Sequence, residues 1–138
     1  MKNKVSIRWI GNMAFEGEVG GHKIMLDATH ESGGGDQGPS PKPLMLLALA
    51  GCTGMDVVAI LKKMRVELDD FQVFVEGDLT EELPKQYEKM KVIFQFKGKD
   101  LPKDKLEKAV SLSEEKYCGV SALYKKVIPL DYEIRVVE

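Results

Sequence analysis

The chain has 138 residues, of which 43% are hydrophobic and 30% are charged, and its formal net charge is −2. This size and composition are typical of one soluble globular domain with its own core, so we expect a single domain over residues 1–138. Interleaved acidic and basic residues exclude the basic stripe of a nucleic-acid-binding protein, and the charged N-terminus has no apolar signal segment, so we expect a cytoplasmic protein.

Three short strands are predicted at the N-terminus, over residues 5–9, 13–19 and 22–27. Apolar residues alternate with polar ones in the first, and Gly20-Gly21 predicts a two-residue hairpin turn between the second and the third. The glycine-rich segment 31–39 lacks the Lys-Ser/Thr ending of a phosphate-binding loop. We expect it to be a flexible connector or lid.

A long helix is predicted next, reaching to about Arg65. Ser40 is suited to the N-cap, with Pro41 at the first helical position. Residues 44–55 are apolar on all sides, which predicts a helix enclosed by other elements. Asp56 would be costly inside a lipid bilayer, so we expect a buried helix and no membrane association.

The remaining elements are two strands, two helices and a final strand. Alternating apolar residues predict strands over 71–76 and 90–97. A helix is expected to begin near 100–103, a shorter one to cover 119–125, and the last strand to cover 127–137. The order βββ-α-ββ-αα-β segregates strands from helices and predicts the α+β class.

Two cysteines are the main candidates for chemistry. Cys52 lies within the apolar helix and Cys118 lies at the joint between the last two helices, too far apart in sequence for a CxxC motif. Local effects favour the thiolate at Cys118, which begins a helix, over Cys52, whose neighbours are apolar and which has Asp56 at position i+4. The alternative interpretation of both is an inert, buried thiol, since cysteine is among the most often buried residues.

The segments around these cysteines resemble the two cysteine signatures of the OsmC/Ohr family. SPKPLMLLALAGC (residues 40–52) is similar to the NPEELLxAALAxC type of segment, and YCGVSAL (117–123) is similar to YCxVSxxL. The resemblance implies an OsmC-like fold, built as an intertwined homodimer with a long buried central helix. It also implies a peroxidase that protects against oxidative stress by reducing organic hydroperoxides. Cys52 would attack the peroxide, Cys118 would resolve the product into a disulfide, and an external dithiol would reduce it, without a cofactor.

Two departures from the family pattern leave an alternative open. Lys42 stands where hydroperoxide-reducing members have Glu, and no arginine occupies the expected place in the N-terminal hairpin, near Phe15 or Glu16. A lysine there would favour an anionic ligand. The alternative is a non-peroxidase member that binds a small anionic or acyl molecule at the dimer pocket, and a third interpretation is a dimeric scaffold with inert cysteines.

Carboxylates and histidines complete the set of candidate site residues. Asp56 is expected to be either a pocket acid or a locally paired residue. Glu115, with Glu114 beside it, either supplies a carboxylate near the sulfurs or forms a solvated helix end. His22 and His30 do not have the spacing of a metal motif relative to the cysteines, so we expect no metal.

Overall fold

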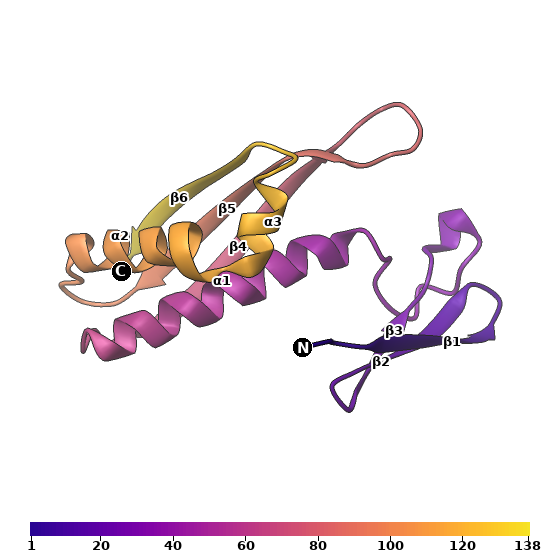
Figure 1. Cartoon of the computed structure of the whole chain (residues 1–138), viewed down its shortest axis with the longest axis horizontal. Helices are drawn as coiled ribbons and strands as arrows, with labels where there is room; N and C mark the ends of the chain where they lie inside the picture. Colours follow the sequence, from indigo (N-terminus) through magenta and orange to yellow (C-terminus); the bar gives the residue numbers. More distant parts are fainter. The chain divides into compact units, whose positions relative to one another are not determined.

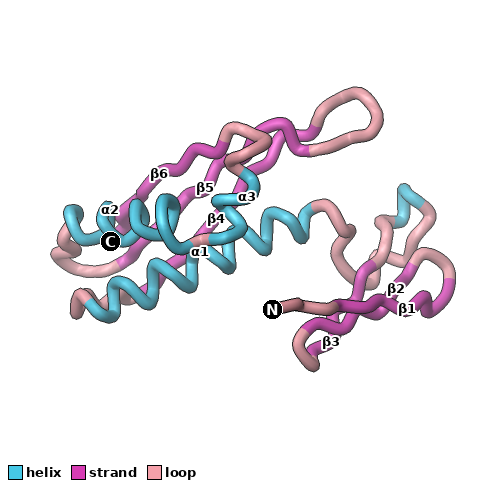
Figure 2. Tube along the Cα trace, in the orientation of Figure 1, coloured by secondary structure: helices cyan, strands magenta, loops and turns pink.

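The computed structural model describes residues 1–138, and their contacts form two compact units, Met1–Met45 and Leu46–Glu138 (Figure 1). Each unit contains one three-stranded sheet, and the second unit also contains nearly all of the helical residues (Figure 2). The order of elements is the predicted one, which confirms the α+β class. The single domain expected over the whole chain stays a prediction.

The first unit is an antiparallel sheet in the order β1-β2-β3. Its strands are β1 (Val5–Gly11), β2 (Ala14–Val19) and β3 (His22–Leu26). Gly20 and Gly21 both have positive φ, which is the conformation that a tight two-residue hairpin turn of the predicted kind requires.

The glycine-rich loop that follows β3 is folded around one carboxylate, with a short 3-10 helix (His30–Ser32) inside it. The buried Asp27 carboxylate accepts hydrogen bonds from the backbone N–H groups of Ala28, Gly35 and Gln37. The bond from Gln37 contributes most to holding the pKa of Asp27 below its usual value, and the other two add to it against the opposing effect of burial. Three hydrogen bonds to Asp27 therefore define the path of this loop, and its role as a flexible connector or lid stays a prediction.

We expect Gly34→Ala to destabilise the first unit by about 1–3 kcal/mol, because a Cβ at this position would overlap the backbone carbonyl of Ala28. Trp9, the only tryptophan, lies in this unit, so its fluorescence during urea unfolding measures the effect. Gly119→Ala is the control, since a Cβ there meets nothing within 4 Å. Equal unfolding midpoints for the two variants would contradict the close packing of this loop.

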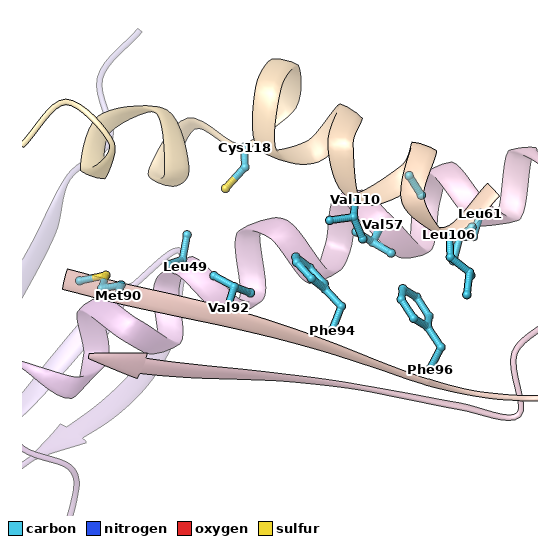
Figure 3. Packing of buried hydrophobic residues seen from close by; sticks show 11 residues of the cluster. Leu49, Val57, Leu61, Met90, Val92, Phe94, Phe96, Leu106, Val110 and Cys118 are labelled. Atoms are coloured by element: carbon cyan, nitrogen blue, oxygen red, sulfur yellow. The ribbon is translucent and has the colours of Figure 1, made fainter. Parts of the chain in front are cut away.

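The second unit places helices on one face of the sheet β4-β5-β6. Its elements are all but the first three residues of α1 (Pro43–Lys63), then β4 (Asp70–Leu79), β5 (Tyr87–Lys97), α2 (Lys103–Leu112), a π-helical turn (Ser113–Tyr117), α3 (Gly119–Tyr124) and β6 (Leu130–Val137). β5 pairs antiparallel with β4 and parallel with β6. Buried residues from the sheet and the helices meet in one core, which includes Phe94, Val57 and Val110 (Figure 3).

Helix α1 begins at Pro43, later than the Ser40 cap and Pro41 start predicted from the sequence. The reason is local, because a proline disfavours helical conformation in the residue before it, and here that residue is Lys42. Pro43 itself is tolerated because the first turn of a helix needs no donor at that position.

Only one stripe of α1 is buried within this chain, although the sequence predicts an enclosed helix. Leu49, Thr53, Val57 and Leu61 face the core, while Leu47 is 65% exposed and Met55 is 77% exposed on other faces. By length and composition alone α1 is apolar enough to cross a membrane, a test that core helices also pass. Here its buried stripe packs against the sheet of its own unit.

Candidate functional site

The two cysteines, far apart in sequence, come together with Asp56 in the second unit. The two sulfurs and a carboxylate oxygen of Asp56 all lie within 4.8 Å of one another. Both cysteines are free thiols, Cys52 half-buried and Cys118 buried, and the Cys118 side chain points from the helical layer into the core (Figure 3). The fold therefore creates a thiol pair with an adjacent carboxylate.

Cys118 is positioned by the irregular connection between α2 and α3. Its N–H donates to the Ser113 carbonyl, 2.8 Å away across the π-helical turn, and its side chain caps α3 by accepting from the Ser121 N–H at 3.3 Å. A π-helical turn changes the direction in which later side chains point, and such turns are frequent at functional sites. The turn places Ser113 and Glu114 in the interior, facing α1.

A buried polar network connects α1 with this turn and with α3. Thr53 Oγ1 lies 2.8 Å from Ser113 Oγ, which donates to Asp56 Oδ2 at 3.0 Å. The Glu114 carboxylate accepts from Thr53 Oγ1 at 3.3 Å and from Ser121 Oγ at 2.8 Å. Every buried side-chain nitrogen and oxygen has at least one hydrogen-bond partner, as a stable buried polar cluster requires.

The environment of Cys118 keeps its thiol protonated. Burial, with a smaller contribution from the hydrogen bond with Cys52, raises the pKa of Cys118 to about 12, although the hydrogen bond from the Ser121 N–H acts in the opposite direction. The helix-start effect that favours a Cys118 thiolate is therefore present, but burial outweighs it. At neutral pH the Cys118 side chain is a neutral thiol, a poor nucleophile.

The other candidate residues predicted from the sequence differ in burial and in their distance from the sulfurs. Asp56 is half-buried beside the sulfurs, whereas Glu115 is exposed at the surface. Glu114, and not Glu115, is the glutamate that lies in the interior, with only 5% of its surface exposed. Lys42 is exposed and belongs to the first unit, and both cysteines belong to the second.

Sequence reasoning did not identify the hydroxyl residues of the network, which are Thr53, Ser113 and Ser121. The one signal in the sequence is the position of Ser113, which follows Leu106, Ala109 and Val110 at the spacing of one helix face. A serine on such a face requires a buried hydrogen-bond partner, and this points to a polar contact beneath the helix.

We expect the two thiols to differ strongly in reactivity towards iodoacetamide at neutral pH. The shift from the ordinary value of 9.0 to about 12 lowers the thiolate fraction of Cys118 by about 1000-fold, so Cys118 should be alkylated slowly. Mass spectrometry of the labelled chain measures both rates of alkylation. The variants Cys52→Ser and Cys118→Ser assign each rate to one thiol, and labelling in urea gives the rates of the two exposed thiols. Fast labelling of Cys118 in the folded protein would contradict the buried, neutral state.

Comparison with known proteins places these features in a family context. Residues 33–133 match the family described as OsmC-like protein. The chain is 34% identical over 132 residues to Protein YhfA of Escherichia coli, covering 95% of this chain and 96% of that protein. It is 31% identical to a hypothetical protein from Aquifex aeolicus, whose crystal structure has a TM-score of 0.84 and covers 100% of this chain and 99% of that chain.

Two further solved structures are similar in fold at lower sequence identity. The organic hydroperoxide resistance protein OhrB of Bacillus subtilis is 18% identical, with a TM-score of 0.68 over 98% of both chains. An OsmC-like protein from Mycoplasma pneumoniae is 10% identical, with a TM-score of 0.84 over 100% of this chain and 99% of that chain. At these identities the likeness is one of fold, and it confirms the fold predicted from the two cysteine segments.

Proposed function

The chain belongs to the OsmC-like protein family, and we propose from this premise that it is a thiol peroxidase that reduces organic hydroperoxides. The observation that carries the proposal is the thiol pair itself, with both sulfurs within 4.8 Å of each other and one of them more accessible than the other. We propose Cys52 as the attacking thiol and Cys118 as the resolving one, because Cys52 is half-buried and Cys118 is buried and neutral.

The proposed reaction has three balanced steps. The Cys52 thiolate attacks the outer oxygen of the hydroperoxide, the O–O bond breaks, and the products are a sulfenic acid on Cys52 and an alkoxide that takes up a proton to leave as an alcohol. The Cys118 thiol then condenses with the sulfenic acid, forming the disulfide and releasing water. An external dithiol reduces this disulfide by thiol–disulfide exchange and becomes a disulfide itself.

Asp56 is proposed to carry the proton between these groups. It lies beside both sulfurs, and it begins a chain of oxygens that runs through Ser113 and Thr53 to Glu114. This chain has three oxygen–oxygen contacts but only two hydroxyl protons, so a proton taken up by either carboxylate completes the third hydrogen bond. Asp56 would accept the Cys52 thiol proton and later return it to the alkoxide, so the net charge of the site would stay constant.

We propose that the protein works as a cytoplasmic homodimer. The support is the uncovered apolar side of α1, where Leu47 and Met55 are largely exposed, together with the homodimer that the family resemblance implies. A reducing cytoplasm would also keep both cysteines as thiols between catalytic cycles.

The proposal is tested by measuring consumption of cumene hydroperoxide by the reduced protein, with a lipoyl-type dithiol as the reductant. We expect catalytic turnover, with loss of both free thiols when the dithiol is left out. Absence of turnover, with both thiols remaining free after excess peroxide, would disprove a peroxidase.

A second candidate is binding of a small anionic or acyl molecule, favoured by Lys42, which is exposed where the family pattern of hydroperoxide-reducing members has Glu. Native mass spectrometry of the purified protein distinguishes the two functions. A retained small molecule, lost in Lys42→Glu and without peroxide consumption, would favour ligand binding.

A further inference from the structure

Two sulfurs and a carboxylate oxygen within 4.8 Å of one another also form a set of metal ligands. Thiolates are soft ligands that select zinc-class ions over magnesium or calcium. We propose that the reduced protein binds one zinc-class divalent cation through Cys52, Asp56 and Cys118, and that cation binding and disulfide formation exclude each other. The cation would therefore act as a reversible block on the thiol pair.

The geometry requires only a small contraction of the present arrangement. In a tetrahedral zinc site, Zn–S distances of about 2.3 Å and Zn–O distances of about 2.0–2.2 Å place neighbouring ligand atoms about 3.5–3.8 Å apart. The three atoms here are no more than 4.8 Å apart, and two of them belong to half-buried side chains on the same helix, Cys52 and Asp56. Three protein ligands leave the fourth position for water, as in an open zinc site.

Outer contacts orient two of the three ligands. Ser113 Oγ donates to Asp56 Oδ2 at 3.0 Å, which orients that carboxylate. The Ser121 N–H donates to Cys118 Sγ at 3.3 Å, and such a donor stabilises a thiolate ligand. Donors of this kind to ligand atoms hold them in place and are typical of metal sites in proteins.

Charge and proton balance are consistent with a divalent ion. Two thiolates and one carboxylate carry three negative charges, which an ion of charge +2 reduces to one. Each thiol that binds releases a proton to solvent, and no electron is transferred, so the cation leaves the cysteines reduced. A disulfide removes both thiolates, which is why the oxidised chain cannot hold the ion. His22 and His30 belong to the first unit and are not needed for this ligand set.

The test is titration of the reduced, full-length protein with cadmium, whose thiolate complexes absorb in the ultraviolet. We expect saturation at one ion per chain, displacement of cadmium by zinc, and no absorption from the protein oxidised to its disulfide. Cys52→Ser and Cys118→Ser should each abolish or greatly weaken the absorption, and Asp56→Asn should lower the affinity at least 10-fold. Glu115→Gln is the matched control, since this carboxylate is exposed, and it should bind as the wild type does.

A second measurement uses the wild-type protein alone. Bound zinc should protect both thiols from alkylation and from a disulfide-forming oxidant, and a chelator should restore their reactivity. The proposed site would be overturned if the absorption did not saturate as cadmium is added, or if Asp56→Asn bound cadmium with unchanged affinity. Because neither measurement uses a hydroperoxide, the cation site and the peroxidase can fail independently.

Discussion

Replacing Cys52 with serine is expected to lower hydroperoxide turnover by at least about 1000-fold, because no other nucleophile in the site can substitute for the Cys52 thiolate. The serine hydroxyl is similar in size but is not ionised at neutral pH, so the attack on the O–O bond is lost. Cys118 cannot take over, since burial, the largest cause of its raised pKa, remains in this variant and keeps it a neutral thiol. The assay is peroxide consumption with the dithiol reductant at several peroxide concentrations.

Cys118→Ser is the matched comparison, because it removes the second sulfur and retains the first. We expect it to reduce one equivalent of peroxide and to stop at the Cys52 sulfenic acid, which a dimedone-type reagent would trap with a defined increase in mass. Unchanged turnover in Cys52→Ser, or a sulfenic acid found on Cys118 in the wild type, would reverse the proposed order of the two cysteines.

Most of the fold could be predicted from patterns that depend on short-range physics. Alternation of apolar residues predicted the sheet strands, and Gly20-Gly21 predicted a turn whose two residues both have positive φ. The start of α1 was misplaced because two rules competed there. Pro41 suits a first helical position, but Pro43 disfavours helix at Lys42, and the second effect prevailed.

The candidate site was predicted in part, for a reason visible in its residues. The cysteine segments identified the family, and Asp56 could be placed on the same helix face as Cys52 from their spacing alone. Glu115 and Glu114 could not be distinguished, because the choice between them depends on the π-helical turn, which shifts the interior face by a residue. No local sequence pattern indicates that turn, which is stabilised by contacts with Thr53 on a distant helix.

Glu114→Ala is expected to destabilise the second unit by about 3 kcal/mol or more. The carboxylate accepts from Thr53 and Ser121, whose side chains are fully buried, and the substitution removes both hydrogen bonds. Thr53 can turn its hydroxyl to Ser113 Oγ, whereas the Ser121 hydroxyl is left without an acceptor. A lost hydrogen bond to a charged group costs about 1.5–3 kcal/mol, and two are lost here. Urea unfolding followed by far-ultraviolet circular dichroism measures the change. Glu114→Gln should show a smaller loss, because it keeps the size and one acceptor oxygen.

Glu114→Ala should also slow disulfide formation by at least about 10-fold, because Glu114 holds the start of α3 in position. Ser121 donates its hydroxyl to Glu114 and its backbone N–H to Cys118 Sγ, so a loosened Ser121 releases the sulfur from its position beside Cys52. Misplacement of reacting atoms by about 1 Å costs up to 100-fold in rate. Single-turnover measurement of the sulfenic acid and the disulfide separates this step from the attack by Cys52, which should keep its rate. Glu115→Ala removes the exposed neighbouring carboxylate, and we expect both its stability, within about 0.5 kcal/mol, and its rates to match the wild type. If the two alanine variants behave alike, the buried network neither supports the fold nor positions the resolving thiol.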